Sequence, residues 1–386
     1  MKKKNVLFVV DERQMGGVSV LLNDILWNIN IKKYNIDIAI LHNAGDYLKK
    51  LPKQVNIIYG TSFFNTVDLT LKEALKLRKL NIIYNKLHLI FLMKTKLIGR
   101  KIIKERKKMF TKTYDVEVAF KDGFTAIFTA YGNSIKKYHW LHTDYAMYDC
   151  TANYKPLFNV VLSKFDKIIG ISKSVLTRFC EKYNIKKTDV IYNIIDKEKI
   201  IFKSKLEKIT YDSNKLNLIS VGRFHNMKGY DRLIDVLHFL DNDGKLDNTT
   251  VRLIGSGPDD ELIKNKIDEY NLKDKVILLG RKENPFPYVL SSDCFLMCSR
   301  YEPFGLVILE SLILGIPVLS TKVASIDEIM KEDYGMIVDN SESGLYDGLS
   351  KIIKNKNILT KYKNNLKKYN YDITNIIKQI EGLLDE

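Results

Sequence analysis

The sequence predicts an α/β protein made of two domains, each with a parallel β-sheet that carries helices on both faces. Short apolar runs alternate with longer helical patterns along the chain, an order that is typical of parallel sheets. The alternation breaks in a loose, charged stretch at 197–215 and then restarts. A chain of 386 residues can bury two hydrophobic cores, so we expect one domain on each side of this linker.

The expected strands follow one another in two groups. The first is "NVLFVVD", whose five apolar residues end at Asp11, so it indicates a strand and not an export signal. Residues 16–29, "GGVSVLLNDILWNI", follow it with a helical pattern. No apolar run approaches the ~18 residues that a membrane span needs. The expected strands are 5–11, 37–43, 55–60, 115–120, 137–142 and 167–172 in the first group, then 216–223, 249–257, 275–280, 294–299, 317–322 and 334–339.

These groups place the domain boundaries. We expect a Rossmann-like domain at 1–195 and a second one at 196–365. The remaining residues, 366–386, are expected to form a helix that packs back toward the first domain. Ligands of such sheets bind beyond the carboxyl ends of the strands.

The charge of the chain is strongly positive and unevenly spread. The chain has 62 Lys and Arg against 46 Asp and Glu, and residues 71–110 hold thirteen of the former and two of the latter. Leu, Ile, Phe and Tyr lie between these cations, a pattern that suits an anionic membrane surface. The alternative is a solvated basic face that only covers its own domain. Nucleic acid is a weaker alternative, because the chain has no helix-turn-helix, zinc-finger or RNA-binding signature.

The cysteines and acidic motifs predict no metal site. Of Cys150, Cys180, Cys294 and Cys298, only the last two are close in sequence, and all four are expected to be reduced thiols of a cytosolic protein. "DND" at 241–243 matches an Asp-x-Asp metal motif, but its polar surroundings indicate a turn.

Two glycine-containing loops follow expected strands of the second domain. In "SVGRFHNMKGYDRLI", Arg223 and Lys228 lie beyond a strand end, where two cations suit a diphosphate. A charged surface loop is the alternative. In "LIGSGPDDELI", Asp260 replaces the third glycine of the dinucleotide fingerprint, so a tight turn is favoured over a nicotinamide site.

The first domain offers two further candidates. Gly16 and Gly17 open a helix after the first strand, where backbone N–H groups can face a phosphate. His142 follows a strand in "HWLHTDY" beside Asp144, which favours a site histidine, although a single histidine is more often a packed core residue.

The stretch "EPFGLVILESLILGIPVL" has an unusual distribution of acids. Seven uncharged residues separate Glu302 from Glu310, and packing alone gives no reason for a buried helix to lie between two carboxylates.

Taken together, these motifs resemble glycosyltransferase family 4, whose GT-B fold has two Rossmann-like domains facing a central cleft. The resemblance is strongest from about 216 to 340. It is carried by "VGRFHNMKGYDRLI", "IGSGP", "VILLG" and "EPFGLVILESLILGIPVLSTKVASIDEIM", which occur in the order and spacing of that family.

The resemblance implies roles for the candidate residues. Arg223 and Lys228 would bind the donor diphosphate and stabilise the leaving nucleotide in place of a metal. Glu302 would reach hydroxyls of the donated sugar, and Glu310 would accept hydrogen bonds from the ribose. The remaining donor-site residues would be Gly16, Gly17, Phe304, Gly305 and Leu306 around the phosphate, His142 by the sugar, and Arg281 near the base.

The function implied is that of a retaining, metal-independent hexosyltransferase at the inner face of the plasma membrane. It would move a hexose or N-acetylhexosamine from a nucleotide sugar, UDP-linked in preference to GDP-linked, to a lipid-linked saccharide for a surface polysaccharide. No cofactor beyond this co-substrate is expected. The alternatives are a non-catalytic GT-B subunit that supports a partner transferase and a basic nucleic-acid-binding protein.

Overall fold

The computed structural model describes residues 3–11, 17–41, 51–67, 69–145 and 155–386. The chain divides into two units. Unit 1 contains residues 1–194 and 373–386, and unit 2 contains residues 195–372. Each unit is described by itself below.

Unit 1 is built on a seven-stranded parallel sheet in the order β3-β2-β1-β4-β5-β6-β7. Its interior strand β1 is buried from Val6 to Val10, as expected for a strand covered on both faces. The strands are β1 (Lys4–Val10), β2 (Tyr34–Ile40), β3 (Asn56–Tyr59), β4 (Val116–Ala119), β5 (Lys136–Leu141), β6 (Lys167–Gly170) and β7 (Thr188–Val190).

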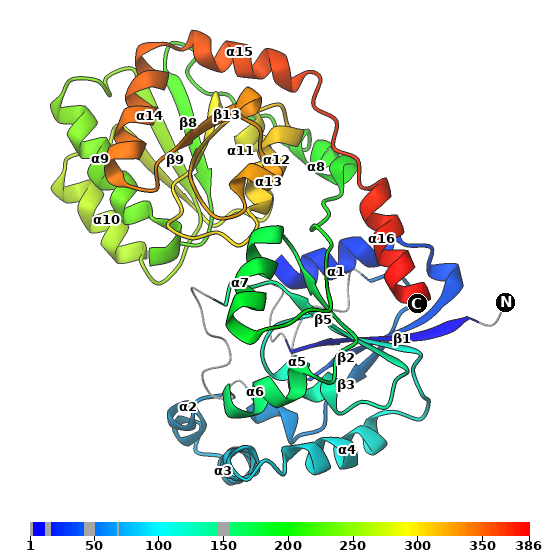
Figure 1. Cartoon of the computed structure of the whole chain (residues 1–386). Helices are drawn as coiled ribbons and strands as arrows, with labels where there is room; N and C mark the ends of the chain where they lie inside the picture. Colours follow the sequence, from blue (N-terminus) through cyan, green and yellow to red (C-terminus); the bar gives the residue numbers. More distant parts are fainter. Residues whose placement is uncertain (1–2, 12–16, 42–50, 68, 146–154) are drawn as a thin grey trace. The chain divides into compact units, whose positions relative to one another are not determined.

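The helices of unit 1 surround this sheet (Figure 1). They are α1 (Gly17–Asn28), α2 (Leu71–Lys76), α3 (Leu80–Lys94), α4 (Ile98–Met109), α5 (Phe124–Ala130), α6 (Lys155–Leu162), α7 (Lys173–Tyr183) and α16 (Thr374–Asp385), with short 3-10 helices at η1 (Ile31–Lys33) and η3 (Phe64–Thr66).

The last helix of the chain belongs to unit 1. Ile380, Leu383 and Leu384 of α16 are buried. Glu381 accepts a hydrogen bond from the backbone N–H of Asn30, and Glu386 binds both the Tyr138 hydroxyl and the Lys167 ammonium.

Unit 2 has a six-stranded parallel sheet in the order β10-β9-β8-β11-β12-β13. The strands are β8 (Leu216–Val221), β9 (Thr249–Ile254), β10 (Val276–Gly280), β11 (Cys294–Met297), β12 (Val318–Thr321) and β13 (Gly335–Val338). The helices are α8 (Lys197–Ser204), η4 (Asn226–Lys228), α9 (Tyr230–Asn242), α10 (Asp260–Glu269), α11 (Phe286–Leu290), α12 (Leu306–Ile313), α13 (Ile326–Ile329), η5 (Glu332–Tyr334), α14 (Glu342–Lys354) and α15 (Asn357–Leu366).

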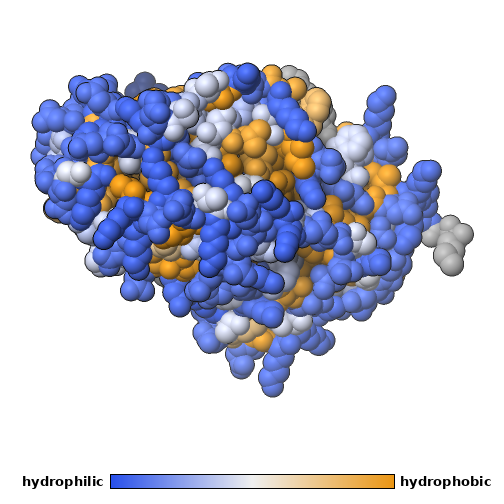
Figure 2. Space-filling view, turned by 90° about the horizontal axis from the view of Figure 1, so that it is seen from above, coloured by the Kyte–Doolittle hydropathy of each residue, from blue (hydrophilic) through white to orange (hydrophobic). Residues whose placement is uncertain are grey.

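Neighbouring residues of strand β8 pack into separate cores on the two faces of the unit 2 sheet. Leu218 contacts the core formed with α9, α10 and α14, whereas Ile219 contacts the core formed with α12 and α13. This alternation places helices on both faces, as Figure 1 shows. On the face of the molecule seen in Figure 2, hydrophilic side chains surround smaller groups of hydrophobic ones.

Every expected strand overlaps an observed one, and β7 is a strand that we did not expect. The α/β prediction with two parallel sheets is therefore confirmed. The loose linker expected at 197–215 is wrong in its first part, because residues 197–204 form α8. Asp196 caps this helix by accepting a hydrogen bond from the backbone N–H of Lys199 at 2.9 Å.

None of the described helices has the length and apolar character needed to cross a bilayer. Of the four cysteines, Cys180, Cys294 and Cys298 are free thiols, and Cys150 lies outside the described residues. Burial raises the pKa of the Cys294 and Cys298 thiols to about 12, so both are protonated at neutral pH.

Candidate active site

The strand order of unit 2 reverses between β8 and β11, and the candidate site lies beyond the carboxyl ends of these two strands. Successive strands extend outward from β8 to β10 on one side and from β11 to β13 on the other. The general ligand position in such sheets is this switch point, next to the loops that follow β8 and β11. These loops are residues 222–229 and 298–305.

An ion pair joins the two loops. The Lys228 ammonium, after β8, donates to a carboxylate oxygen of Glu302, after β11. The Lys228 side chain keeps 30% of its surface accessible and Glu302 keeps 12%. The structure thus brings together two residues that are 74 positions apart in sequence, with the cation still able to contact a ligand.

Helix α12 begins immediately beyond Glu302. Gly305 is its N-cap, with φ +87°, and no side chain caps the first turn. The backbone N–H groups at this end therefore point out of the helix with a partial positive charge. The buried Ser325 hydroxyl donates to the Phe304 carbonyl oxygen at 3.2 Å and so fixes the approach to the helix.

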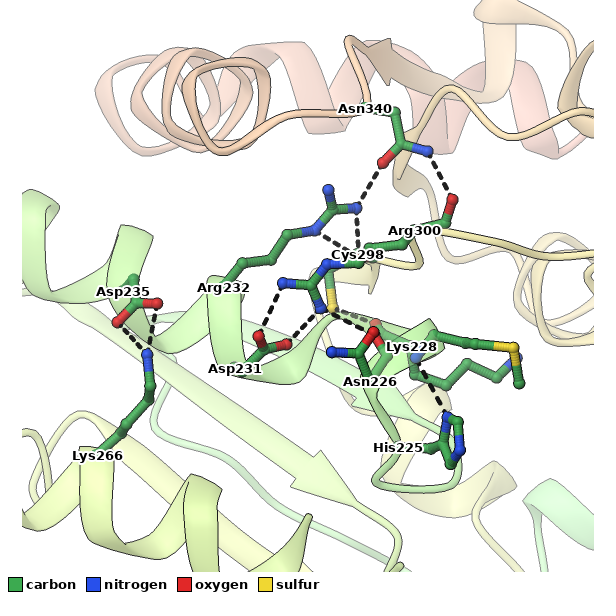
Figure 3. A network of polar contacts seen from close by, with 11 residues as sticks. His225, Asn226, Lys228, Asp231, Arg232, Asp235, Lys266, Cys298, Arg300 and Asn340 are labelled. Carbon is green, nitrogen blue, oxygen red and sulfur yellow. Dashed lines mark hydrogen bonds and ion pairs between the residues drawn. The ribbon is translucent and has the colours of Figure 1, made fainter. Parts of the chain in front are cut away.

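Three side chains that we did not select from the sequence are Arg300, Asp231 and Arg232 (Figure 3). They connect the loop after β11 to the loop after β8 and to the start of α9. Arg300 makes a bidentate pair with Asp231, at 2.6 and 2.7 Å, and donates to the Asn226 carbonyl oxygen. Arg232 donates two hydrogen bonds to the Cys298 carbonyl oxygen. Paired planar contacts of this kind fix orientation as well as distance, so they position Lys228 and Glu302 without touching them.

Glycine at 229 is required by this loop contact. Gly229 has φ +68°, and a Cβ atom there would lie 2.2 Å from the Cys298 carbonyl oxygen. Gly255 and Gly257 have the same kind of role, because Cβ atoms would lie 1.9 Å from the Gly222 oxygen and 2.1 Å from the Phe224 oxygen. The "IGSGP" glycines therefore allow two loops to touch, and Asp260 accepts a hydrogen bond from the Gly257 N–H. This agrees with the tight turn expected there.

The other predicted residues of unit 2 lie along the same edge of the sheet. Arg223 is exposed just beyond β8, and Arg281 is exposed just beyond the edge strand β10. Glu310 is partly buried, four residues into α12, and Phe304 is buried below the loop. Their roles toward a donor stay predictions.

In unit 1, Gly17 begins α1, and Gly16 lies outside the described residues. His142 follows β5, its backbone N–H donates to Asp122 at 2.9 Å, and its ring packs against Phe120 with 4.8 Å between centroids. Burial, with smaller contributions from His139 and Lys121, lowers the pKa of His142 to about 3. The imidazole is therefore neutral at pH 7 and does not supply a positive charge there.

Unit 1 also carries an ion pair across its own strand reversal, between β1 and β4. The Lys121 ammonium lies 2.6 Å from an Asp11 carboxylate oxygen. Next to it, burial raises the pKa of the Asp122 carboxyl to about 6, although hydrogen bonds from His142 and Tyr145 oppose this rise. Sequence reasoning did not select these residues, because each looks like an ordinary charged loop residue when read alone.

Among the residues that the structure describes, no group of three or more His, Cys, Asp or Glu side chains is arranged to hold a metal ion. The acids of "DND" are both engaged by lysines. Asp241 pairs with Lys275, and Asp243 pairs with Lys245. The turn expected at 241–243 is wrong in its first part, because Asp241 and Asn242 are the last residues of α9 and Asp243 follows as the C-cap.

Comparison with known proteins finds a family match in the second half of the chain. The family model of the glycosyl transferases group 1 matches residues 201–372. A Campylobacter jejuni relative, an N-acetylgalactosamine-N,N'-diacetylbacillosaminyl-diphospho-undecaprenol 4-alpha-N-acetylgalactosaminyltransferase, is 30% identical over 218 residues. That match covers 55% of this chain and 58% of the relative, so the chain aligns with little more than half of the relative's length.

Solved structures cover the whole chain at lower identity. Anabaena HepE in complex with UDP and glucose gives a TM-score of 0.68 at 18% identity, over 99% of both chains. A Rickettsia africae glycosyltransferase gives a TM-score of 0.71 at 17% identity, over 100% of this chain and 98% of that one. These likenesses show the GT-B fold.

Proposed function

From its place among the GT-B proteins of the glycosyltransferase family 4 type, with residues 201–372 matching the group 1 glycosyl transferases, we propose that this chain is a retaining, metal-independent hexosyltransferase. It moves a hexose or N-acetylhexosamine from a UDP-linked donor to a lipid-linked saccharide in the synthesis of a surface glycan.

The observation that carries the proposal is the pairing of Lys228 with Glu302 in front of helix α12. A transferase has to hold a diphosphate and a sugar at adjacent positions. The accessible Lys228 ammonium and the uncapped N-terminus of α12 supply two sources of positive charge at the end of the sheet. Glu302, between them, supplies an acceptor for sugar hydroxyl groups.

The chemistry follows from where charge develops. When the bond between the sugar and the diphosphate breaks, negative charge grows on the leaving phosphate oxygen. Lys228 and Arg223, together with the α12 backbone N–H groups, stabilise that charge without a metal ion. The acceptor hydroxyl attacks on the face that the phosphate leaves, and the departing phosphate takes its proton. Retention and metal independence rest on the family resemblance.

The choice of donor and acceptor rests on the relatives. HepE was solved with UDP and glucose, and the Campylobacter relative acts on a saccharide linked to diphospho-undecaprenol. An acceptor of this kind lies in a membrane, so we also assign the protein to the cytoplasmic membrane surface.

The proposal is tested by donor binding. We expect one UDP-sugar, offered in a panel with GDP- and ADP-sugars and with EDTA present, to raise the melting temperature and to release nucleotide. Lys228→Ala and Glu302→Ala should each lower donor affinity by about tenfold or more, because each removes a charged contact worth about 1.5–3 kcal/mol.

The matched control is Lys266→Ala, which breaks a Lys–Asp pair of the same unit at 2.6 Å, between α9 and α10 and outside the two site loops (Figure 3). It should leave donor binding unchanged. If no nucleotide sugar in the panel raises the melting temperature, the enzyme assignment is wrong and a non-catalytic GT-B subunit is favoured. Turnover that disappears with EDTA and returns with a divalent cation would remove the metal-independent mechanism.

A further inference from the structure

The outer face of helix α3 in unit 1 exposes four large apolar side chains in a single row. Leu80, Tyr84, Leu87 and Phe91 keep 84%, 66%, 50% and 58% of their surfaces accessible. Their spacing of four, three and four residues places them on one side of the helix. We call these four residues the α3 stripe. Single exposed apolar residues are normal on a protein, but a row of four needs an explanation.

The opposite face of α3 packs against the rest of unit 1. Leu89 and Leu92 are buried. The Lys86 ammonium is turned inward and donates to the Thr66 carbonyl oxygen at 3.2 Å. His88 packs against Phe63 with ring centroids 5.9 Å apart. Since α3 already has a packed inner face, the stripe is a second apolar face that the described residues of unit 1 leave exposed.

Exposed cations frame the stripe at both ends along the chain. Within α3 the one charge before Lys94 is Lys86, whose ammonium is engaged with Thr66, so the outer face is uncharged along the stripe. The exposed basic residues before it are Lys72, Lys76, Arg78 and Lys79, and those after it are Lys94, Lys96, Arg100, Lys104, Lys107 and Lys108. Figure 1 shows α2, α3 and α4 following one another along the lower edge of unit 1.

The two acids of this segment offset little of the positive charge that flanks the stripe. Glu73 closes a capping box with Thr70 at the start of α2. Glu105 lies on the buried face of α4, and its carboxylate is 2.9 Å from the ammonium groups of both Lys101 and Lys108. The outward residues of α4 are cations and Ile103, so α4 extends the basic surface beyond the stripe.

We propose that the α3 stripe docks this protein on an anionic lipid bilayer, with the stripe inserted at the boundary between headgroups and acyl chains. The flanking lysines and arginines contact the lipid phosphates. The inference deepens the proposed function, on whose membrane-bound acceptor it rests, by naming the residues that hold the protein on the membrane.

The composition of the surface favours lipid over other partners. An apolar row between two cationic ends matches a bilayer interface, where acyl chains lie beside anionic headgroups. Tyr84 and Phe91 are of the residue types that bury an aromatic body at this boundary. A nucleic acid would use the cations but would leave the stripe in water. A second copy of this chain would bring two strongly basic segments together, which like-charge repulsion disfavours.

The test is co-sedimentation of the full-length protein with vesicles, without nucleotide or saccharide. We expect binding to phosphatidylcholine vesicles that contain about half phosphatidylglycerol, and weak binding to pure phosphatidylcholine. Tyr84→Ser/Phe91→Ser should lower the vesicle partition coefficient by about tenfold or more, because both residues are exposed and contribute apolar area. Lys104→Gln/Lys107→Gln should lower it for anionic vesicles and make the remaining binding less sensitive to salt.

Phe202→Ser in α8 of unit 2 is the matched control, because Phe202 is 66% exposed and lies outside the stripe. It should bind vesicles like the unchanged protein. Equal binding by the stripe variant, or no binding of the unchanged protein to anionic vesicles, would overturn the proposal. A concentration-dependent dimer that the stripe variant abolishes, with no vesicle binding, would assign the stripe to a second copy instead. A protein that binds vesicles but no nucleotide sugar would support the docking surface and contradict the proposed function.

Discussion

Gly305 holds the α12 N-terminus in a conformation that other residues adopt at a cost. Its φ of +87° lies in the left-handed region, and a Cβ atom would approach the Ile308 and Ile329 side chains at 3.2 Å. Gly305→Ala should therefore lower the free energy of unfolding by about 1–2 kcal/mol, measured by urea titration. It should also weaken donor binding, because the added methyl group lies 3.4 Å from the Glu302 Cγ atom.

Gly315→Ala separates backbone strain from the effect on the site. Gly315 follows α12 with φ +75°, and a Cβ atom there meets nothing within 4 Å. The two substitutions should cost similar unfolding free energy, but only Gly305→Ala should change donor affinity in a thermal-shift titration. Equal donor affinities would mean that the conformation at 305 matters for folding alone.

At the residue scale, the sequence was enough to select candidate site residues but not the contacts between them. Lys228 and Glu302 were both predicted, because each stands in a recognisable motif at a strand end. Their ion pair depends on β8 and β11 being neighbours, which sequence order alone does not reveal. The Asn340 side chain, which follows the edge strand β13 and accepts a hydrogen bond from Arg232 at 2.6 Å, gave no signal in the sequence.

At the scale of elements, α4 depends on one buried acid. Although burial opposes ionisation, hydrogen bonds from Lys101 and Lys108 lower the pKa of Glu105 to about 2. A carboxyl whose folded pKa is depressed adds stability above its unfolded pKa of about 4.5 and loses that stability as the pH falls toward its folded pKa. The ion pairs that Glu105 makes within the basic helix therefore persist throughout the neutral and mildly acidic range.

Glu105→Gln should destabilise the protein by about 1–3 kcal/mol between pH 5 and 7. The difference from the unchanged protein should shrink to about half near pH 3, because the native carboxylate is by then losing its advantage over the unfolded one. Urea unfolding at three pH values measures this difference. A constant difference across the range would show that the substitution acts through packing and not through the charge.

Strands were more predictable than the helices and loops between them. Buried parallel strands appear as continuous apolar runs bounded by turns, so their positions followed directly from the sequence. Helix α8 was missed because its charged composition, "KEKIIFKS", has a narrow apolar face, and the signal that could have found it is the capping aspartate at 196. The order of the strands within each sheet needed the structure.

At the scale of the whole molecule, two segments that are far apart in the sequence form unit 1 together. Residues 373–386 return to unit 1 after the whole of unit 2 has been completed. Unit 1 is therefore assembled from both ends of the chain, and its stability includes the burial of α16. Both tryptophans, Trp27 and Trp140, are in unit 1, so tryptophan fluorescence reports the unfolding of this unit selectively.

Leu384→Ala tests this arrangement. Leu384 is buried in α16, and its truncation should lower the unfolding free energy of unit 1 by about 2–4 kcal/mol through lost burial and a remaining cavity. The midpoint of a urea titration followed by tryptophan fluorescence should fall accordingly. The matched substitution Leu349→Ala, in the buried face of α14, removes the same group from unit 2. It should shift the transition seen by circular dichroism and leave the fluorescence midpoint in place.

If Leu384→Ala leaves the fluorescence midpoint unchanged, α16 contributes nothing to the stability of unit 1. The contacts of Glu381 and Glu386 are then surface contacts that add nothing to the unfolding free energy. If both substitutions shift both signals together, the two units unfold as one cooperative structure.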